Sequence, residues 1–164
     1  MYEYNAKILR IVDGDTIDVD IDLGFGVWIH KERIRLEGID TPESRTKDLE
    51  EKKFGLLSKE YVRSLLPVGS IVKLVCKTYD SKGKFGRILG DIELKETRMI
   101  GREITEHSSL VKTMIDNGYG VEYYGQSKTE IINAHLKNRE RLIKEGVIDG
   151  WHGSQARYDR RKIR

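Results

Sequence analysis

Residues 16–23, Thr-Ile-Asp-Val-Asp-Ile-Asp-Leu, alternate between apolar and acidic side chains without interruption after Thr16. Successive side chains of a β-strand point to opposite faces, so this pattern predicts a strand with one buried and one solvated face, as in antiparallel sheets. The buried face is expected to hold Ile17, Val19, Ile21 and Leu23. The opposite face holds Asp18, Asp20 and Asp22, which we interpret as a wet strand surface rather than a calcium site.

The segments on either side of this strand predict two partners. Residues 5–12 read as a preceding strand, and Gly24-Phe25-Gly26 supplies a turn into a third strand at 27–38. Within the third strand the apolar positions change parity between Ile29 and Ile34, which predicts a β-bulge. Two further strands are predicted at 70–78 and 87–94, separated by a polar loop at 79–86.

Helical spacing appears in three places. A charged loop at 44–53 leads into a predicted helix at 54–66, and the loop could serve as a mobile flap or simply face solvent. A second helix is predicted at 109–117, before Gly118. The third opens with a capping-box pattern at Ser127 and ends at Gly146. Residues 95–107 fit either a strand extension or a long loop.

Together these elements predict an α+β domain in which five short strands close a barrel of the oligonucleotide-binding (OB) type, accompanied by three α-helices. A chain of 164 residues accommodates one such domain. The formal net charge of +3 comes from the end of the chain, because residues 151–164 hold five basic residues and one acidic residue. Net charge therefore does not identify a ligand.

Other features of the composition exclude several classes. No apolar run is long enough to cross a bilayer and the first residues do not resemble a signal peptide, so we expect a cytoplasmic protein that does not bind membranes. Cys76 is the single cysteine, which excludes an internal disulfide and a cysteine zinc site and favours a buried thiol. Four histidines, His30, His107, His135 and His152, match no zinc or histidine-nuclease motif and are expected to be bystanders.

Three short motifs carry the residue types that phosphodiester hydrolysis needs. Asp13-Gly14-Asp15-Thr16 also fits an ordinary hairpin turn, and Asp40-Thr41-Pro42-Glu43 also fits an ordinary helix start. A residue before proline is extended, which can aim the Thr41 carbonyl at a cation beside Asp15 and Asp40. Arginines match phosphate with a planar fork, and two of them, Arg35 and Arg87, lie on predicted strands.

The order of these motifs is more specific than any one of them. Asp13-Gly14-Asp15-Thr16, then Arg33-Ile34-Arg35-Leu36 leading to Ile39-Asp40-Thr41-Pro42-Glu43, then Lys84-Phe85-Gly86-Arg87, closely resembles the staphylococcal (micrococcal) nuclease, or thermonuclease, family. Trp151 follows the predicted helices in the expected order. The resemblance implies a nuclease domain at 1–151 and a basic C-terminal tail at 152–164.

The resemblance also implies a function and residue roles. It implies a monomeric endonuclease that binds one Ca²⁺ ion, prefers single-stranded DNA and RNA, and leaves 5′-hydroxyl and 3′-phosphate ends. Asp15, Asp40 and the Thr41 carbonyl resemble the metal ligands, with Asp13 behind them. Glu43 resembles the general base, and Arg35 and Arg87 resemble the phosphate clamp. The residues that resemble the substrate-binding groups are Lys84, Phe85, Tyr123 and Tyr124.

The sequence departs from the staphylococcal enzyme in three places. Phe85 replaces a tyrosine and so lacks a hydroxyl contact to phosphate, the hairpin between Thr16 and Arg33 is longer, and residues 95–107 look inserted. Two alternatives to an enzyme stay open: a nucleic-acid-binding module on the same barrel without catalysis, and a protein-interaction module. The presence of every expected carboxylate and arginine favours the enzyme.

Overall fold

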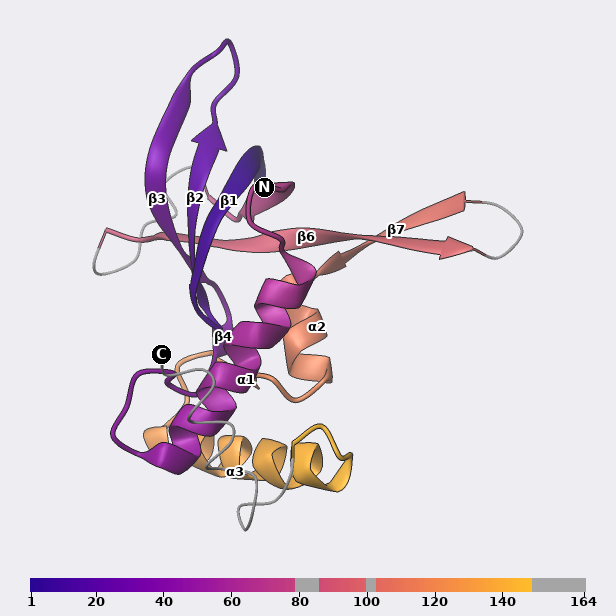
Figure 1. Ribbon diagram of the computed structural model, residues 1–164. Helices are drawn as coiled ribbons and strands as arrows, with labels where there is room; N and C mark the ends of the chain where they lie inside the picture. Colours follow the sequence, from indigo (N-terminus) through magenta and orange to yellow (C-terminus); the bar gives the residue numbers. More distant parts are fainter. Residues whose placement is uncertain (79–85, 100–102, 149–164) are drawn as a thin grey trace.

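The chain forms the expected α+β barrel. The computed structural model describes residues 1–78, 86–99 and 103–148, with only the backbone of 96–99 and 103–106. In that part of the chain the barrel runs in the order β3-β2-β1-β5-β6 and closes where β3 pairs with β6 in parallel (Figure 1). Its strands are β1 (Tyr2–Asp13), β2 (Thr16–Asp22), β3 (Trp28–Leu36), β5 (Ile71–Cys76) and β6 (Ile88–Met99).

The alternation along β2 sets the inner face of the barrel, as the sequence predicts. Ile17, Val19 and Ile21 are buried, but Leu23 is 43% exposed because the strand ends at Asp22. The predicted bulge is also present: Val19 pairs with Glu32 but Ile21 pairs with Ile29, which leaves an extra residue in β3. The bulge keeps Ile34 pointing inward and the neighbouring arginines pointing outward.

The described residues at 95–99 and 103–107 form strands rather than a long loop. β6 continues to Met99 and pairs antiparallel with β7 (Glu103–Ser109). This hairpin extends well beyond the barrel, toward the right in Figure 1. The predicted loop at 79–86 lies outside the described residues except for Gly86.

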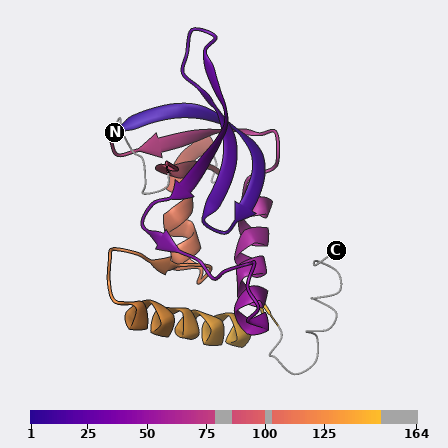
Figure 2. The same ribbon diagram turned by 90° about the vertical axis from the view of Figure 1, so that its left-hand side faces the viewer.

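Three helices lie on one side of the barrel: α1 (Leu49–Leu65), α2 (Leu110–Asp116) and α3 (Lys128–Lys144). In Figure 2, α1 and α2 stand between the barrel and α3, which lies across their far ends. The predicted start of the first helix at 54 is wrong, since the Asp48 carboxylate accepts hydrogen bonds from the first turn and starts the helix five residues earlier. The expected cap at Ser127 is confirmed.

A second, very small sheet joins the barrel to the helices. β4 (Ile39–Asp40) pairs with β8 (Val121–Glu122), where Asp40 lies opposite Val121. The predicted third strand at 27–38 therefore ends early, at Leu36, because Gly38 adopts a positive φ of 81° and turns the chain away from β3. This turn directs Asp40 toward α3.

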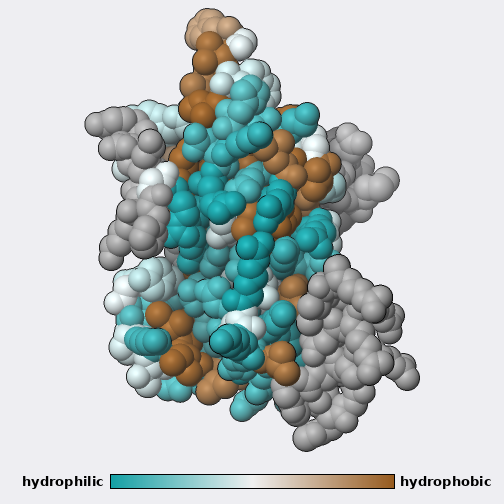
Figure 3. All heavy atoms as spheres, turned by 60° about the vertical axis from the view of Figure 1, so that its left-hand side comes forward, coloured by the Kyte–Doolittle hydropathy of each residue, from teal (hydrophilic) through white to brown (hydrophobic). Residues whose placement is uncertain are grey.

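The β2–β3 hairpin projects from the barrel and carries exposed apolar side chains at its tip, at the top of Figure 3. Phe25 is fully exposed there, and Trp28 is 38% exposed. At the other end of the hairpin, the surface is largely hydrophilic (Figure 3). Cys76 is buried, as expected. Among the described residues, no helix has the length and apolar character needed to cross a membrane.

Candidate active site

The turn between β1 and β2 brings two aspartates to one end of the barrel. Asp13 pairs with Thr16 across a two-residue turn. The segment is thus an ordinary hairpin turn that also carries two of the predicted site residues. The Asp13 carboxylate accepts the Gly14 N–H at 2.9 Å, and Asp15 accepts the Thr16 hydroxyl at 2.9 Å. A side chain at Gly14 would lie about 3 Å from Ser58 and Thr41, so glycine lets the turn pack against α1.

Strand pairing then places Arg35 beside Asp15. Thr16 lies opposite Arg35 in the β2–β3 pair, and the Leu36 N–H donates to the Asp15 carbonyl at 2.8 Å. Nη2 of Arg35 lies 3.2 Å from Oδ2 of Asp15, while Nη1 donates to the Leu36 carbonyl at 2.7 Å. Both side chains are more than four-fifths buried, so this ion pair is held in a fixed position.

Asp40 is the second carboxylate at this guanidinium. Its Oδ1 lies 4.0 Å from Nη2 of Arg35, so one arginine stands between the two predicted metal ligands. Its Oδ2 lies 2.7 Å from Nε2 of His135 on α3. The prediction that all four histidines are bystanders is therefore wrong for His135. Thr41, the third predicted ligand, is 4% exposed and lies against Gly14.

Glu43 is held by α1 at the edge of this group. Its backbone N–H donates to the Glu51 carboxylate at 3.3 Å. Gly55, inside α1, allows the close approach: a β-carbon at that position would lie 2.3 Å from the Glu43 carbonyl oxygen. Ser44 is buried and residues 49–53 belong to α1, so the predicted loop at 44–53 is confined to its first half.

Negative charge dominates the electrostatics of this region. Loss of hydration, followed by repulsion from the neighbouring Asp13 and Asp15, raises the pKa of Glu43, although its side chain remains exposed. Loss of hydration also raises the pKa of Asp13, partly offset by the Gly14 N–H. Four carboxylates thus lie close together and two of them, Asp15 and Asp40, share one guanidinium, which is an arrangement that attracts a cation.

Arg87 directly precedes β6, the strand that closes the barrel. Ile88 pairs with Ile34, and the outward faces of the two strands therefore carry Arg87 close to Arg33 and Arg35. Arg87 lines a groove with Arg33 and Asp18, next to the site rather than inside it. The structure thus gathers Asp13, Asp15, Arg35, Asp40, Thr41 and Glu43 directly, and places Arg87 beside them, just before the neighbouring strand.

The predicted substrate-binding residues are less well placed. Tyr123 and Tyr124 follow β8 and are 47% and 73% exposed. The Tyr123 N–H donates to the Gly38 carbonyl at 2.9 Å, which ties this segment to the turn before Asp40. Lys84 and Phe85 lie outside the described residues, as do Trp151, His152 and the tail at 152–164.

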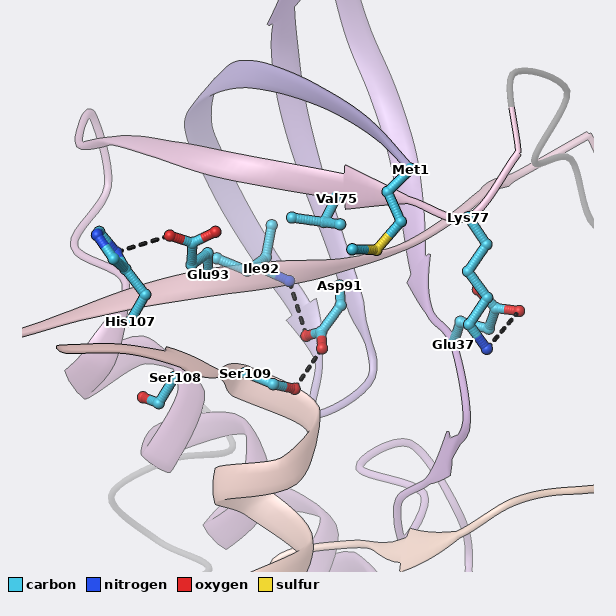
Figure 4. A pocket seen from close by; sticks show the side chains of 10 residues that line it. All are labelled: Met1, Glu37, Val75, Lys77, Asp91, Ile92, Glu93, His107, Ser108 and Ser109. Atoms are coloured by element: carbon cyan, nitrogen blue, oxygen red, sulfur yellow. Dashed lines mark hydrogen bonds and ion pairs between the residues drawn. The ribbon is translucent and has the colours of Figure 1, made fainter.

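A separate cavity of about 400 Å³ lies between β5, β6 and β7 and contains none of the predicted site residues (Figure 4). The polar groups shown there bind one another: His107 lies 2.6 Å from Glu93, and Lys77 lies 3.5 Å from Glu37. Asp91 accepts from Ser109 and from Val111 at the start of α2, so it anchors that helix. These polar side chains of the cavity are therefore occupied by structural contacts.

Comparison with known proteins agrees with this geometry. A sequence model of the staphylococcal nuclease homologue family matches residues 33–152. The chain belongs to this family. Membership confirms the resemblance seen in the sequence motifs and agrees with the five-stranded barrel. The family match begins after the turn that carries Asp13 and Asp15, which this structure joins to the matched region through Arg35.

Curated relatives cover most of the chain. An uncharacterized endonuclease of Escherichia coli is 33% identical over 145 residues, covering 88% of this chain and 77% of the relative. An uncharacterized protein of Methanocaldococcus jannaschii is 27% identical over 173 residues, covering 92% of this staphylococcal nuclease homologue and 73% of the relative. An uncharacterized protein of Bacillus anthracis is 28% identical over 146 residues, covering 89% of this chain and 60% of the relative.

Proposed function

We propose that this staphylococcal nuclease homologue is a divalent-metal-dependent endonuclease that hydrolyses phosphodiester bonds of DNA and RNA. The observation that carries the proposal is the group of Asp15, Asp40 and Glu43 around Arg35, on a barrel whose family includes nucleases. The relative from Escherichia coli that is named an endonuclease supports the same class of activity.

The residues fit a hard cation such as Ca²⁺. Asp15 and Asp40 supply carboxylate oxygens within reach of one point, and the Thr41 carbonyl adds a third oxygen of the kind calcium prefers. No group of three or more histidine, cysteine or acidic side chains able to hold a metal occurs among the described residues, so water would complete the coordination. Asp13 would add negative charge behind these ligands.

When bound, the cation neutralises charge on the phosphate and lowers the cost of activating water. Glu43 accepts a proton from the attacking water, and its raised pKa makes it a stronger base at neutral pH. The water oxygen then bonds to phosphorus while the bond from phosphorus to the 5′ oxygen breaks. The 5′ oxygen takes up a proton, which leaves 5′-hydroxyl and 3′-phosphate ends.

Arg35 and Arg87 stabilise the charge that grows on the phosphate oxygens during this step. Two planar guanidinium groups on neighbouring strands can donate in pairs, which a lysine cannot do. The open surface around them and the exposed Tyr123 and Tyr124 favour a single-stranded substrate whose bases can stack on aromatic rings. Lys84 and Phe85 complete the proposed set of substrate-binding residues.

The test is an incubation of the protein with single-stranded DNA and RNA in the presence of calcium, magnesium or a chelator, followed by analysis of the product ends. We expect cleavage that is lost on chelation. A non-catalytic nucleic-acid-binding module would bind the strands without cutting them, and a protein-interaction module would do neither. If pure wild-type protein cleaves neither substrate with any cation, the proposed endonuclease activity is refuted.

A further inference from the structure

A contact between α3 and Asp40 has no counterpart in the sequence motifs. Nε2 of His135 lies 2.7 Å from Oδ2 of Asp40, and the two residues are 95 positions apart in the sequence. The His135 side chain is 13% exposed, whereas that of Asp40 is 35% exposed. Because a carboxylate oxygen only accepts, Nε2 carries the hydrogen and His135 is the donor.

The position of His135 is fixed by the anchoring of its helix. Asn138 lies three residues further along α3, on the same face, and donates to the Gly120 carbonyl at 3.1 Å. Gly120 directly precedes β8, in which Val121 pairs with Asp40. The helix and the strand pair therefore hold the imidazole and the carboxylate at a constant separation.

The contact decides which Asp40 oxygen faces the site. With Oδ2 bound to His135, the free Oδ1 is the oxygen that lies 4.0 Å from Arg35. Arg35 already binds Asp15 at 3.2 Å. If Asp40 were released, its carboxylate could turn and pair fully with the guanidinium, since arginine readily binds carboxylates in a bidentate way. The two metal ligands would then be neutralised by Arg35 instead of a cation.

We infer that His135 is a positioning residue that orients the Asp40 carboxylate toward the divalent cation and keeps it from closing onto Arg35. This inference rests on the proposed metal-dependent function. His135 acts through Asp40 and does not contact the substrate. Hydrogen-bond donors behind a metal ligand commonly contribute 10- to 100-fold to metal affinity, which sets the size of the expected effect at about that level.

The experiment measures calcium binding by titration calorimetry, together with kcat and KM for a single-stranded oligonucleotide at several calcium concentrations. His135→Ala should weaken calcium binding by roughly 10- to 100-fold, with kcat recovering toward wild type when calcium is raised. His135→Gln should restore most of the affinity, since the glutamine amide nitrogen can reach the place of Nε2 and donate to Asp40.

Two control variants separate the hydrogen bond from general effects. His107→Ala removes a histidine–carboxylate contact of similar length, the one to Glu93, outside the candidate site. Asn138→Ala removes one of several contacts that anchor α3, and because Arg139 still pairs with Glu50 and Leu142 stays buried, His135 should remain in place. Both should bind calcium as wild type does. If Asn138→Ala weakens binding as much as His135→Ala, helix placement is what matters and the positioning role is refuted.

The remaining outcomes distinguish this inference from the proposed function. Unchanged calcium affinity in His135→Ala, with wild-type protein that binds calcium and cleaves, overturns the positioning role alone. An alanine variant that loses affinity but is not rescued by glutamine also overturns it. Wild-type protein that neither binds divalent cations nor cleaves overturns the proposed function, and the inference fails with it.

Discussion

Two groups of carboxylates lie at opposite parts of the β2–β3 hairpin and differ in how they are compensated. The hairpin row comprises Asp18, Asp20 and Asp22. The site cluster comprises Asp13, Asp15, Asp40 and Glu43. Both groups contain only acidic residues on or beside short strands, so sequence composition does not separate them.

Each aspartate of the hairpin row has a donor of its own. Asp18 binds the Arg33 guanidinium at 2.8 Å, and Asp22 accepts the Gly24 N–H at 2.8 Å. Asp20 accepts the Lys31 N–H, which is the main reason why its pKa is lowered. The hairpin row therefore shapes the bulge and the turn, and its charges need no further partner.

The site cluster shows a different electrostatic balance. Lost hydration raises the pKa values of Asp13 and Glu43, with added repulsion from neighbouring carboxylates, while Arg35 places a positive charge beside Asp15 and Asp40. Carboxylates with perturbed pKa values that lie close together are common at functional sites. The comparison teaches that the direction of the pKa shifts, rather than the number of carboxylates or the presence of local donors, distinguishes the hairpin row from the site cluster.

The largest expected effect is that of Glu43→Gln. Loss of a general base should lower kcat by about 100- to 10,000-fold, measured with a single-stranded oligonucleotide. The same variant should unfold at a higher temperature near neutral pH, because it removes a charge that its neighbours repel. A variant with full activity would exclude Glu43 as the base.

The pH dependence of this stability gain follows from the direction of the shift. The pKa of Glu43 in the folded protein is raised above its ordinary value of 4.5, so the folded state holds the proton more tightly than the unfolded state. Wild-type stability therefore falls as the pH rises from the unfolded pKa through the folded one. The higher stability of Glu43→Gln should disappear below about pH 4, where Glu43 is protonated. A gain in stability that does not change with pH would contradict charge repulsion at Glu43.

The next largest effect is expected for the arginines. Arg35→Lys and Arg87→Lys keep the charge but lose the planar fork, and each should lower kcat by about 100- to 1,000-fold. Arg33→Lys is the matched control, since Arg33 lies on the same outward face of β3 and binds the hairpin row at Asp18. Its rate should stay within about twofold of wild type. Equal losses of kcat in all three variants would contradict a specific role of Arg35 in the site cluster.

A smaller effect should follow from adding calcium to the wild-type protein. A cation that binds only the folded state stabilises it by about 2.7 kcal/mol at 100 times the dissociation constant, a rise in Tm of roughly 5–10 °C. Chelator should reverse the rise in a thermal melt, and Asp15→Asn should abolish it. An equal rise in the Asp15→Asn variant would place the cation elsewhere.

The smallest effect is expected in the hairpin row. Asp18→Asn breaks an ion pair whose arginine is 48% exposed, and such pairs contribute about 0.2–1 kcal/mol. Chemical denaturation should detect a loss of that size, with activity within about twofold of wild type. A severe loss of activity with intact folding would show that the hairpin row takes part in the reaction.

The features that the sequence could predict are those with a local signal. Alternation predicted β2, a parity change predicted the bulge in β3, and the order of the motifs predicted which carboxylates meet Arg35. The early start of α1 had a signal that periodicity did not reveal: Asp48, followed three residues later by Glu51, is a helix-capping pattern.

Other features had no local signal at all. β4 and β8 are two residues each, too short to show a period. The contact between His135 and Asp40 depends on how α3 packs against those strands, and histidine in an amphipathic helix is unremarkable in sequence. Tertiary packing, rather than propensity, therefore decided the part of the site that reasoning from motifs missed.

Gly55 has no β-carbon, and this links the packing of α1 to the position of Glu43. Replacing a glycine inside a helix with alanine ordinarily raises the free energy of unfolding by about 1 kcal/mol. Selection for thermal stability alone would therefore favour alanine in an ordinary helix. Here the added methyl group would enter the peptide that joins Glu43 to Ser44. Alanine at position 55 is therefore expected to lower the stability of the chain through this clash and to displace Glu43, so a screen for more stable variants should keep glycine there.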